Sequence, residues 1–383
     1  MTFGEEEQTR MKWSWRIGRY AGVDVYVHAT FLLLIGWIAA SHLIAGRTLG
    51  AAAAGVAFIV ALFLCVLLHE YGHALMARKY GIRTRDITLL PIGGVARLER
   101  MPENPKQELW VALAGPAVNV VIAAVLFLWL EVRNAWEPVA GLSVSGGSMA
   151  ERLLFANGFL VLFNLIPAFP MDGGRVLRAL LASRMEYTRA TQIAAGVGQG
   201  IALLFGLVGL FANPFLLFIA LFVWIGAAQE SSTVQMKSSL AGIPVQQAMM
   251  TDFRTLIPQD PLARAVQLVL RGSQQDFPVV SEGRVVGVLT RADLLAALAR
   301  HDEDSPVEKI MHPRFQAADS SDMLEKVLAR LQECDCHTLP VMHHGKLVGL
   351  ITADNLGEFL MVQAALSRRS VAPSIGPLQE RAA

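Results

Sequence analysis

Charge is scarce in this sequence. Only 17% of the 383 residues are Asp, Glu, Lys or Arg, against about 25% in a typical soluble domain. Because 54% of the residues are hydrophobic, the composition excludes a disordered chain. A mean hydropathy of +0.44 also argues against a single soluble globule, and a chain of this length is expected to hold about two or three domains.

Cysteine and net charge are also in short supply. An odd count of three cysteines, with Cys65 inside an apolar run, excludes a disulfide framework. Cys334 and Cys336 have the spacing of half a metal site, but the second half is missing, so we interpret them as free thiols. A net charge of +1 gives no electrostatic basis for binding nucleic acid.

Long uncharged segments are abundant instead. A membrane-spanning helix needs about 20 mostly apolar residues, and Ala212-Asn213-Pro214 is a turn signal that splits the longest uncharged run in two. The sequence therefore predicts a multi-span α-helical membrane protein with six transmembrane helices. We expect the spans at about residues 25–46, 51–74, 109–130, 150–168, 190–211 and 214–230.

Lys and Arg residues cluster on alternate connections between these segments. They fill the N-terminal tail and the loops after the second and fourth spans, at positions 10, 12, 16, 19, 78, 79, 83, 85, 97, 100, 106, 175, 178, 184 and 189. Positive loops favour the cytoplasmic side. We therefore expect cytoplasmic N- and C-termini in a cell (inner) membrane, and no cleavable signal peptide, because the chain starts polar and charged.

The loop after the second span is more than a linker. Residues 87–96 combine strand-forming residues with a Gly93-Gly94 break. Such backbone is tolerated at membrane depth only where protein or a cavity covers it. We therefore expect a membrane-associated β-hairpin or sheet there.

After about Lys237 the composition becomes that of a soluble α/β domain with an internal repeat. Residues 277–280 recur at 339–342 and residues 287–290 recur at 349–352, both with a shift of 62, whereas residues 248–250 recur at 309–311 with a shift of 61. Two such units are expected to pack as a pseudo-symmetric pair. The predicted divisions are an N-terminal tail (1–20), a membrane domain (21–235), two repeat units (236–305 and 306–365) and a flexible tail (366–383).

The second span ends in His69-Glu70-Tyr71-Gly72-His73. Residues four apart share a helix face, so both imidazoles can bind one Zn²⁺. Glu70 can then take a proton from the activated water. The alternative is two polar histidines near a helix end, but an ionisable cluster inside a membrane helix is costly and indicates function.

Catalytic zinc takes three protein ligands, and Asp172 is the intramembrane acidic candidate for the third. It follows the fourth span, where Pro167, Pro170 and Gly173 would break the helix. The second and fourth spans both run inward by the charge pattern. We therefore expect Asp172 at the depth of the two histidines.

These motifs resemble the site-2 protease family of intramembrane zinc metalloproteases over about residues 15–230. The specific motifs are His69-Glu70-x-x-His73 and Asn164-x-x-Pro167-x-x-x-x-Asp172-Gly173. The resemblance implies that His69, His73 and Asp172 bind zinc and that Glu70 is the general base. It also implies that the Asn164 amide hydrogen-bonds the developing oxyanion, although Asn164 could simply cap a broken helix.

Two supporting motifs accompany them. By the resemblance, Gly93-Gly94 belongs to an edge strand that captures an unwound substrate segment. The alternative is an ordinary turn. Ala114-Gly115-Pro116-x-x-Asn119 lies on the third span, and we interpret it as structural, allowing close helix packing.

The C-terminal repeat resembles a pair of cystathionine-β-synthase (CBS) domains over about residues 245–362. Such pairs often bind adenine nucleotides through G-h-x-T/S-x-x-D, and the first unit fits with Thr290, Arg291 and Asp293. The second unit has Thr352 and Asp354, but Asn355 replaces the usual Asp. The alternative is a dimerisation module without ligand, and a homodimer through the CBS pair is expected.

The expected function is that of a zinc metalloendopeptidase. It would hydrolyse peptide bonds within or near transmembrane segments of membrane proteins, in regulated intramembrane proteolysis modulated by nucleotide. The alternatives are a CBS-regulated transporter or channel and an inactive scaffold. A transporter should show related halves or a path of intramembrane charges, which the sequence does not offer, and the intact Glu70 argues against a scaffold.

Overall fold

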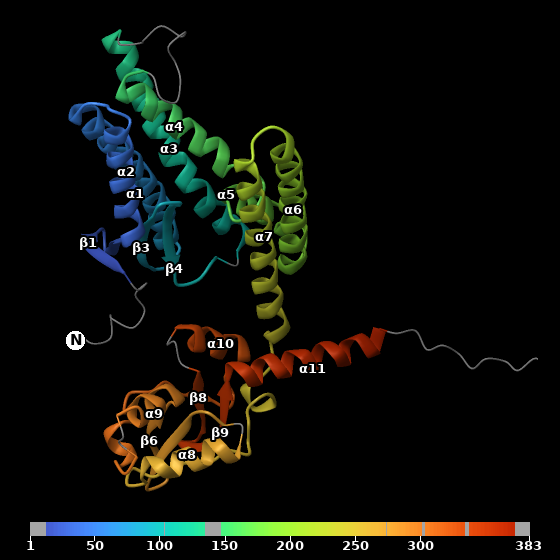
Figure 1. Cartoon of the computed structure of the whole chain (residues 1–383). Helices are drawn as coiled ribbons and strands as arrows, with labels where there is room; N and C mark the ends of the chain where they lie inside the picture. The colour runs from blue at the N-terminus through green and yellow to red at the C-terminus, as the bar shows by residue number, and fades with distance from the viewer. Residues whose placement is uncertain are drawn as a thin grey trace, which may run out of the picture. The chain divides into compact units, whose positions relative to one another are not determined.

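The computed structural model describes residues 13–102, 104–134, 147–272, 274–300, 303–333 and 337–371 (Figure 1). The chain divides into two compact units between Gln235 and Met236. We call their described parts the N-terminal unit (13–235) and the C-terminal unit (236–371). Cys334, Cys336 and most of the predicted C-terminal tail lie outside the described residues.

Helices and one four-stranded sheet form the N-terminal unit. Its elements are β1 (Ser14–Tyr20), β2 (Val23–His28), α1 (Ala29–Ile44), α2 (Leu49–Lys79), β3 (Thr84–Leu90), β4 (Gly93–Leu98), α3 (Pro105–Arg133), α4 (Met149–Asn164), α5 (Asp172–Ala182), α6 (Tyr187–Phe211) and α7 (Phe215–Leu240). Residues 236–240 of α7 belong to the C-terminal unit. Several helices begin at sequence-encoded caps. Thr48 accepts from the Ala51 amide at the start of α2, and Ser148 and Glu151 form a capping box at α4.

Four helices in the described part of the chain are long and apolar enough to cross a membrane: α2, α3, α6 and α7. Two further predicted spans correspond to α1 and α4, each of 16 residues. Such a helix is about 24 Å long, which is shorter than a hydrocarbon core of about 30 Å. The six-span arrangement therefore stays a prediction beyond these four helices.

The start of the first predicted span was wrong by four residues. Residues 25–28 belong to strand β2, and α1 begins at Ala29. In the segment Val23–His28 the β-branched Val recurs at every second position, which favours a strand. An uncharged run marks apolar surroundings, but it does not distinguish a strand from a helix.

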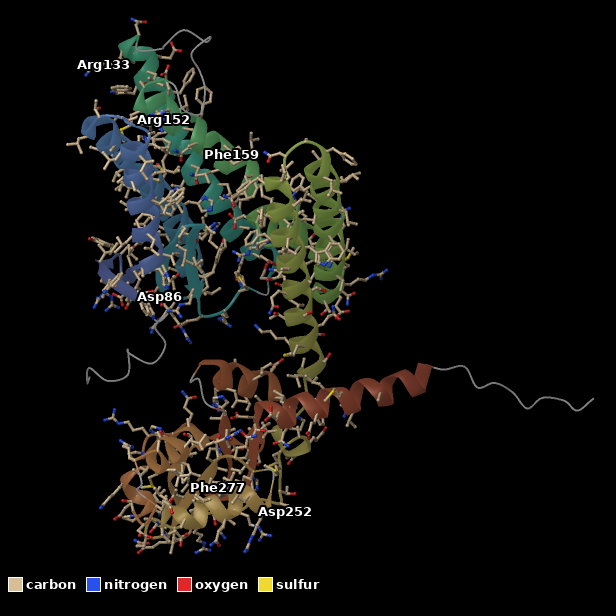
Figure 2. All side chains as sticks on the ribbon, in the orientation of Figure 1. Asp86, Arg133, Arg152, Phe159, Asp252 and Phe277 are labelled. Atoms are coloured by element: carbon tan, nitrogen blue, oxygen red, sulfur yellow. The ribbon has the colours of Figure 1, made fainter. Side chains whose placement is uncertain are left out.

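The predicted strands in the loop after α2 are confirmed as β3 and β4. The sheet has the order β1-β2-β3-β4, so β4 lies at an edge. Asp86 of β3 (labelled in Figure 2) and Arg97 of β4 are register partners. Arg97 Nε donates to Asp86 Oδ1 at 2.9 Å. This cross-strand ion pair stabilises the hairpin register.

The C-terminal unit has two hydrophobic cores. Its helices and strands are α8 (Leu262–Arg271), β5 (Phe277–Ser281), β6 (Arg284–Leu289), α9 (Arg291–Leu298), β7 (Ala318–Asp319), α10 (Leu324–Glu333), β8 (Thr338–His343), β9 (Lys346–Thr352) and α11 (Ala353–Val371). Short 3₁₀ turns precede the repeats at Val245–Gln247 and Val307–Lys309. Phe277, labelled in Figure 2, is buried in the first core, and Leu339 is buried in the second.

The register of the repeat corrects one sequence alignment. Met250 exchanges backbone hydrogen bonds with Leu350, and His312 exchanges them with Val288. Met250 is therefore equivalent to His312, so the shift is 62 here too, not 61. The backbone pairing decides the register, whereas the short Met-containing match had suggested the neighbouring alignment.

Candidate metal centre and nucleotide cleft

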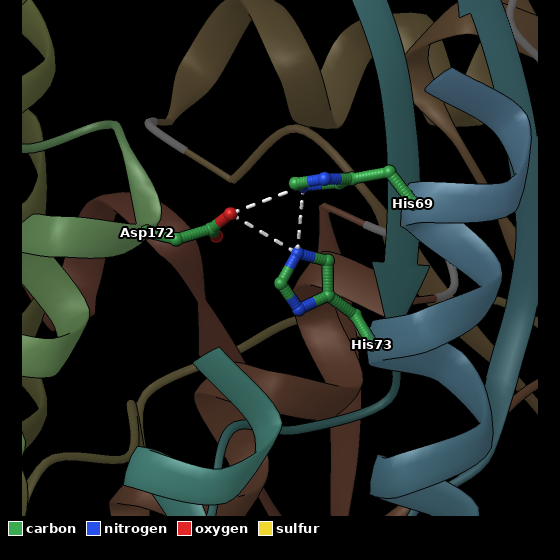
Figure 3. A group of neighbouring side chains, drawn as sticks. All are labelled: His69, His73 and Asp172. Atoms are coloured by element: carbon green, nitrogen blue, oxygen red, sulfur yellow. Dashed lines mark hydrogen bonds and ion pairs between the residues drawn. The ribbon is translucent and has the colours of Figure 1, made fainter. Parts of the chain in front are cut away.

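Two helices bring three ligand atoms together. His69 and His73 lie one turn apart on α2, and their Nε2 atoms are 3.1 Å from each other. Oδ2 of Asp172, the first residue of α5, lies 3.1 Å from each Nε2 (Figure 3). All three residues are buried, at 6%, 4% and 6% exposure. The structure thus places Asp172 beside two histidines that precede it in the sequence by 103 and 99 residues.

The other ring nitrogens determine which atoms can bind a cation. His73 Nδ1 lies 2.7 Å from the Val111 carbonyl oxygen, which can only accept, so Nδ1 carries the proton. His69 Nδ1 lies 2.5 Å from Asn119 Oδ1. Both Nε2 atoms then present lone pairs to a carboxylate oxygen, and this convergence is unfavourable without a cation. The donor set therefore fits zinc, which accepts three protein ligands and keeps one position open.

Asp172 is held by close backbone approach. A Cβ on Gly173 would lie 2.2 Å from the Ile166 carbonyl oxygen, so only glycine lets this loop lie against the start of α5. Arg175 Nη1 lies 3.8 Å from Asp172 Oδ1, while Oδ2 faces the histidines. Arg175 on one side and the two histidines on the other therefore orient the Asp172 carboxylate.

Helix α3 lines the third side of the centre. A Cβ on Gly115 would lie 2.2 Å from His73 Nε2 and 2.6 Å from His69 Nε2. The sequence interpretation of Gly115 and Asn119 as helix-packing residues was therefore incomplete. Gly115 keeps space free beside the ligand atoms, and Asn119 contacts one ligand directly.

A buried ion-pair network joins three helices of the same unit. Arg178 of α5 donates from Nε to Glu108 Oε1 of α3 at 2.7 Å, and from Nη1 to Glu230 of α7. Arg178 is completely buried. It lies on the helix that carries Asp172. The sequence analysis had counted Arg178 among the positive residues after the fourth span, and the pattern did not indicate its burial or its partners.

The comparisons with known proteins agree with this geometry. The Peptidase family M50 model matches residues 57–140 and 142–205, and the CBS domain model matches residues 245–300 and 307–361. The zinc metalloprotease MJ0392 of Methanocaldococcus jannaschii is 32% identical over 347 residues, which are 90% of this chain and 96% of that protein. The chain belongs to peptidase family M50.

Two further relatives cover less of this M50 chain. Stage IV sporulation protein FB of Bacillus subtilis is 32% identical over 157 residues, 41% of this chain and 51% of that protein. The solved site-2 protease from Methanocaldococcus jannaschii is 38% identical over 57% of this chain and 95% of that chain, with a TM-score of 0.43.

Glu70 and the edge strand β4 lie together in this M50 unit. A Cβ on Gly94 would lie 2.7 Å from Glu70 Cγ, so β4 packs on the predicted general base. Gly93 has a φ of +139°, which favours glycine at the start of the strand. The predicted base and the predicted substrate-capturing strand are therefore neighbours.

Asn164, the predicted oxyanion ligand, is the last residue of α4 and is half-buried. Its predicted role stays a prediction. Two other amides, Asn119 and Asn157, are fully buried close to the histidines instead. The family motif had drawn attention to Asn164, while nothing in the sequence around Asn157 distinguished it.

In the C-terminal unit, Thr290, Arg291 and Asp293 line a cleft of about 610 Å³. Thr290 caps α9 and its hydroxyl hydrogen-bonds Asp293. His312 Nε2 lies 2.8 Å from Asp293 Oδ2, and His312 also lines the cleft. Sequence reasoning had not selected His312, because it follows the first repeat in the chain and reaches the cleft only through the fold.

The second predicted nucleotide motif occupies another place. Thr352 and Asp354 are not among the residues that line this cleft. Thr352 donates to Asn355 Oδ1 at 2.8 Å, the same local contact that Thr290 makes with Asp293. The two repeats therefore share a helix-start geometry but offer different chemistry, an amide in one and a carboxylate in the other.

Proposed function

We propose that this M50 protein is an intramembrane zinc endopeptidase. It hydrolyses peptide bonds within or near transmembrane segments of membrane proteins. The observation that carries the proposal is the convergence of His69, His73 and Asp172 beside Glu70. The two histidines and Glu70 lie on α2, a helix long and apolar enough to span a bilayer. The same atoms would hold one zinc ion.

The chain's own residues perform distinct tasks in this mechanism. When bound, zinc supplies a Lewis acid that polarises a carbonyl oxygen and lowers the pKa of water. The Glu70 carboxylate takes the proton of the attacking water and delivers it to the leaving amine. Asn164 donates its amide to the developing oxyanion.

The substrate approaches along β4. A transmembrane helix hides its amides in its own hydrogen bonds, so the scissile segment must unwind first. An edge strand offers unpaired backbone groups that pair with such an extended segment. The contact between Gly94 and Glu70 supports capture beside the base.

The proposed topology has six spans with both termini in the cytoplasm of the inner membrane. The positive residues cluster on alternate connections between the predicted spans, as this topology requires. The CBS pair then lies in the cytoplasm, binds an adenine nucleotide through Thr290, Arg291 and Asp293, and modulates cleavage. A homodimer through the CBS pair completes the proposed assembly, and Thr352 with Asp354 would form a second, weaker nucleotide site.

Metal analysis tests the centre without a known substrate. Purified wild type should contain about one zinc per chain by mass spectrometry, and His69→Ala and Asp172→Ala should each lose it. Arg184→Ala, on an exposed position after α5, is the matched control and should keep zinc. A folded wild type that binds no zinc would overturn the metal centre.

Cleavage is tested with Glu70→Gln. This variant should keep zinc and lose proteolysis, because the amide cannot accept the proton. The measurement compares membrane-protein fragments by mass spectrometry in cells producing wild type or Glu70→Gln, with Glu99→Gln as the control. Identical fragments in the presence of wild type and Glu70→Gln would contradict the protease.

A further inference from the structure

Two buried asparagines form a chain of hydrogen bonds that ends on His69. Asn119 of α3 and Asn157 of α4 are both completely buried. Asn119 Nδ2 donates to Asn157 Oδ1 at 2.8 Å. Asn119 Oδ1 lies 2.5 Å from His69 Nδ1. A buried amide pair between helices is costly unless every group is paired, so this arrangement needs a reason.

The direction of the chain is set at its far end. Asn157 Nδ2 donates to the Leu153 carbonyl oxygen at 2.8 Å. A carbonyl can only accept, so the Asn157 amino group must face Leu153 and its Oδ1 must face Asn119. Asn119 then turns its own amino group toward Asn157. Its Oδ1 remains for His69, and His69 Nδ1 must donate.

This direction decides what His69 can bind. With the proton on Nδ1, Nε2 keeps its lone pair toward Asp172 and His73. If the Asn119 amide were reversed, its amino group would face Nδ1, and the imidazole proton would move to Nε2. A protonated Nε2 cannot ligate a cation.

We propose that Asn157 is a positioning residue that sets the tautomer of His69 through Asn119. The inference rests on the proposed zinc centre and adds the source of its orientation. Asn157 hydrogen-bonds Asn119 and the Leu153 carbonyl, and its effect on His69 passes through the Asn119 amide that it holds in place. The backbone carbonyl of Leu153 is the fixed end of the chain.

The test measures the zinc dissociation constant by competition with a chelating dye, on the full chain in detergent. Asn157→Leu removes the acceptor that holds Asn119 and should weaken zinc binding about 10- to 100-fold, the range for outer partners of metal ligands. Asn157→Asp keeps an acceptor for Asn119 and, as the neutral acid, an O–H donor for the Leu153 carbonyl, so its zinc affinity should remain within about threefold of wild type.

The decisive variant is Asn119→Asp. A carboxylate has two acceptor oxygens and no donor, so it accepts from His69 Nδ1 in either orientation. In this background Asn157→Leu should change zinc affinity by less than about threefold. A packing role for Asn157 would instead weaken zinc binding equally in both backgrounds and would overturn the proposal.

The outcomes separate this inference from the proposed function. A wild type that binds no zinc refutes the metal centre itself. A wild type that binds zinc, together with an Asn157→Leu variant of unchanged affinity, refutes only the positioning role. Thermal unfolding of each variant shows whether a loss of affinity accompanies a loss of folding.

Discussion

The two units of this protein place their polar and apolar side chains in opposite ways. In the N-terminal unit, large apolar side chains such as Phe211 are exposed, while His69, Asn119 and Arg178 are buried. In the C-terminal unit, apolar side chains such as Leu289 are buried, while Asp293 and His312 line an open cleft. A membrane accounts for the first pattern and water for the second.

This difference shows in which unit function depends most on exact side-chain contacts. Buried polar groups in the N-terminal unit have no water to replace a lost partner, so each depends on a few fixed neighbours. Groups that line the C-terminal cleft keep access to water. We therefore expect single substitutions to abolish zinc binding or strongly reduce stability in the N-terminal unit. In the C-terminal unit, we expect them only to weaken nucleotide binding or stability.

The largest effect is expected from Gly115→Ala. The added methyl carbon would lie 2.2 Å from His73 Nε2 and 2.6 Å from His69 Nε2, so it would displace the ligand atoms. We expect complete loss of zinc, measured as metal content. Gly196→Ala is the matched control on α6, because its Cβ meets nothing within 4 Å. Zinc retained in Gly115→Ala would contradict the geometry of the centre.

Arg178→Met should produce the next largest effect, on stability. It leaves Glu108 buried without its partner, and breaking such a pair costs about 3–5 kcal/mol. Thermal unfolding in detergent should show the loss, and the double variant with Glu108→Leu should recover part of it. The exposed Arg184→Met is the control. If Arg178→Met and the control Arg184→Met unfold at the same temperature, the buried network does not stabilise the unit.

A graded effect is expected from Asp293→Ala in the cleft. Removing the carboxylate should weaken ATP binding about tenfold, equivalent to about 1.4 kcal/mol, as titration calorimetry would measure. Asn355→Ala, at the equivalent position of the second repeat, should change it less than about twofold. Equal losses would mean that the two repeats bind nucleotide alike.

The smallest effect is expected from Gly287→Ala. Its Cβ would lie 2.7 Å from Sδ of the flexible Met311 side chain, which can move aside, and 3.0 Å from the His312 carbonyl oxygen, which must shift by a small amount. We expect a loss of about 1 kcal/mol in unfolding free energy and unchanged zinc content. Gly349→Ala, which meets Met249 Sδ at the same distance, should behave alike. Loss of zinc in either variant would remove the contrast between the units.

Much of the site could be predicted because its determinants are local. The spacing of His69 and His73 places both on one helix face, and the broken helix before Asp172 marks a second ionisable group at the same depth. Thr290 and Asp293 are likewise three residues apart at a helix start. The strands of the loop after α2 followed from β-forming residues around two glycines.

Other features could not be predicted because they depend on which helix faces meet. Asn157 is an ordinary amide in an apolar segment until α4 packs on α3. Gly115 is a small residue until two imidazoles lie against it. The sequence also left the register of the repeat uncertain around Met250. The backbone pairing of Met250 with Leu350 and of His312 with Val288 established the shift of 62 residues there.

The sequence by itself determined which unit has apolar surroundings and which has polar ones. It also determined the two histidines, their carboxylate partner and the C-terminal repeat. Hydropathy and short-range spacing are properties of the chain alone. The tertiary structure decided the direction of the hydrogen bonds at His69, the free space beside its Nε2 and the buried partners of Arg178. These depend on atoms brought together from distant helices, and only close packing specifies such contacts.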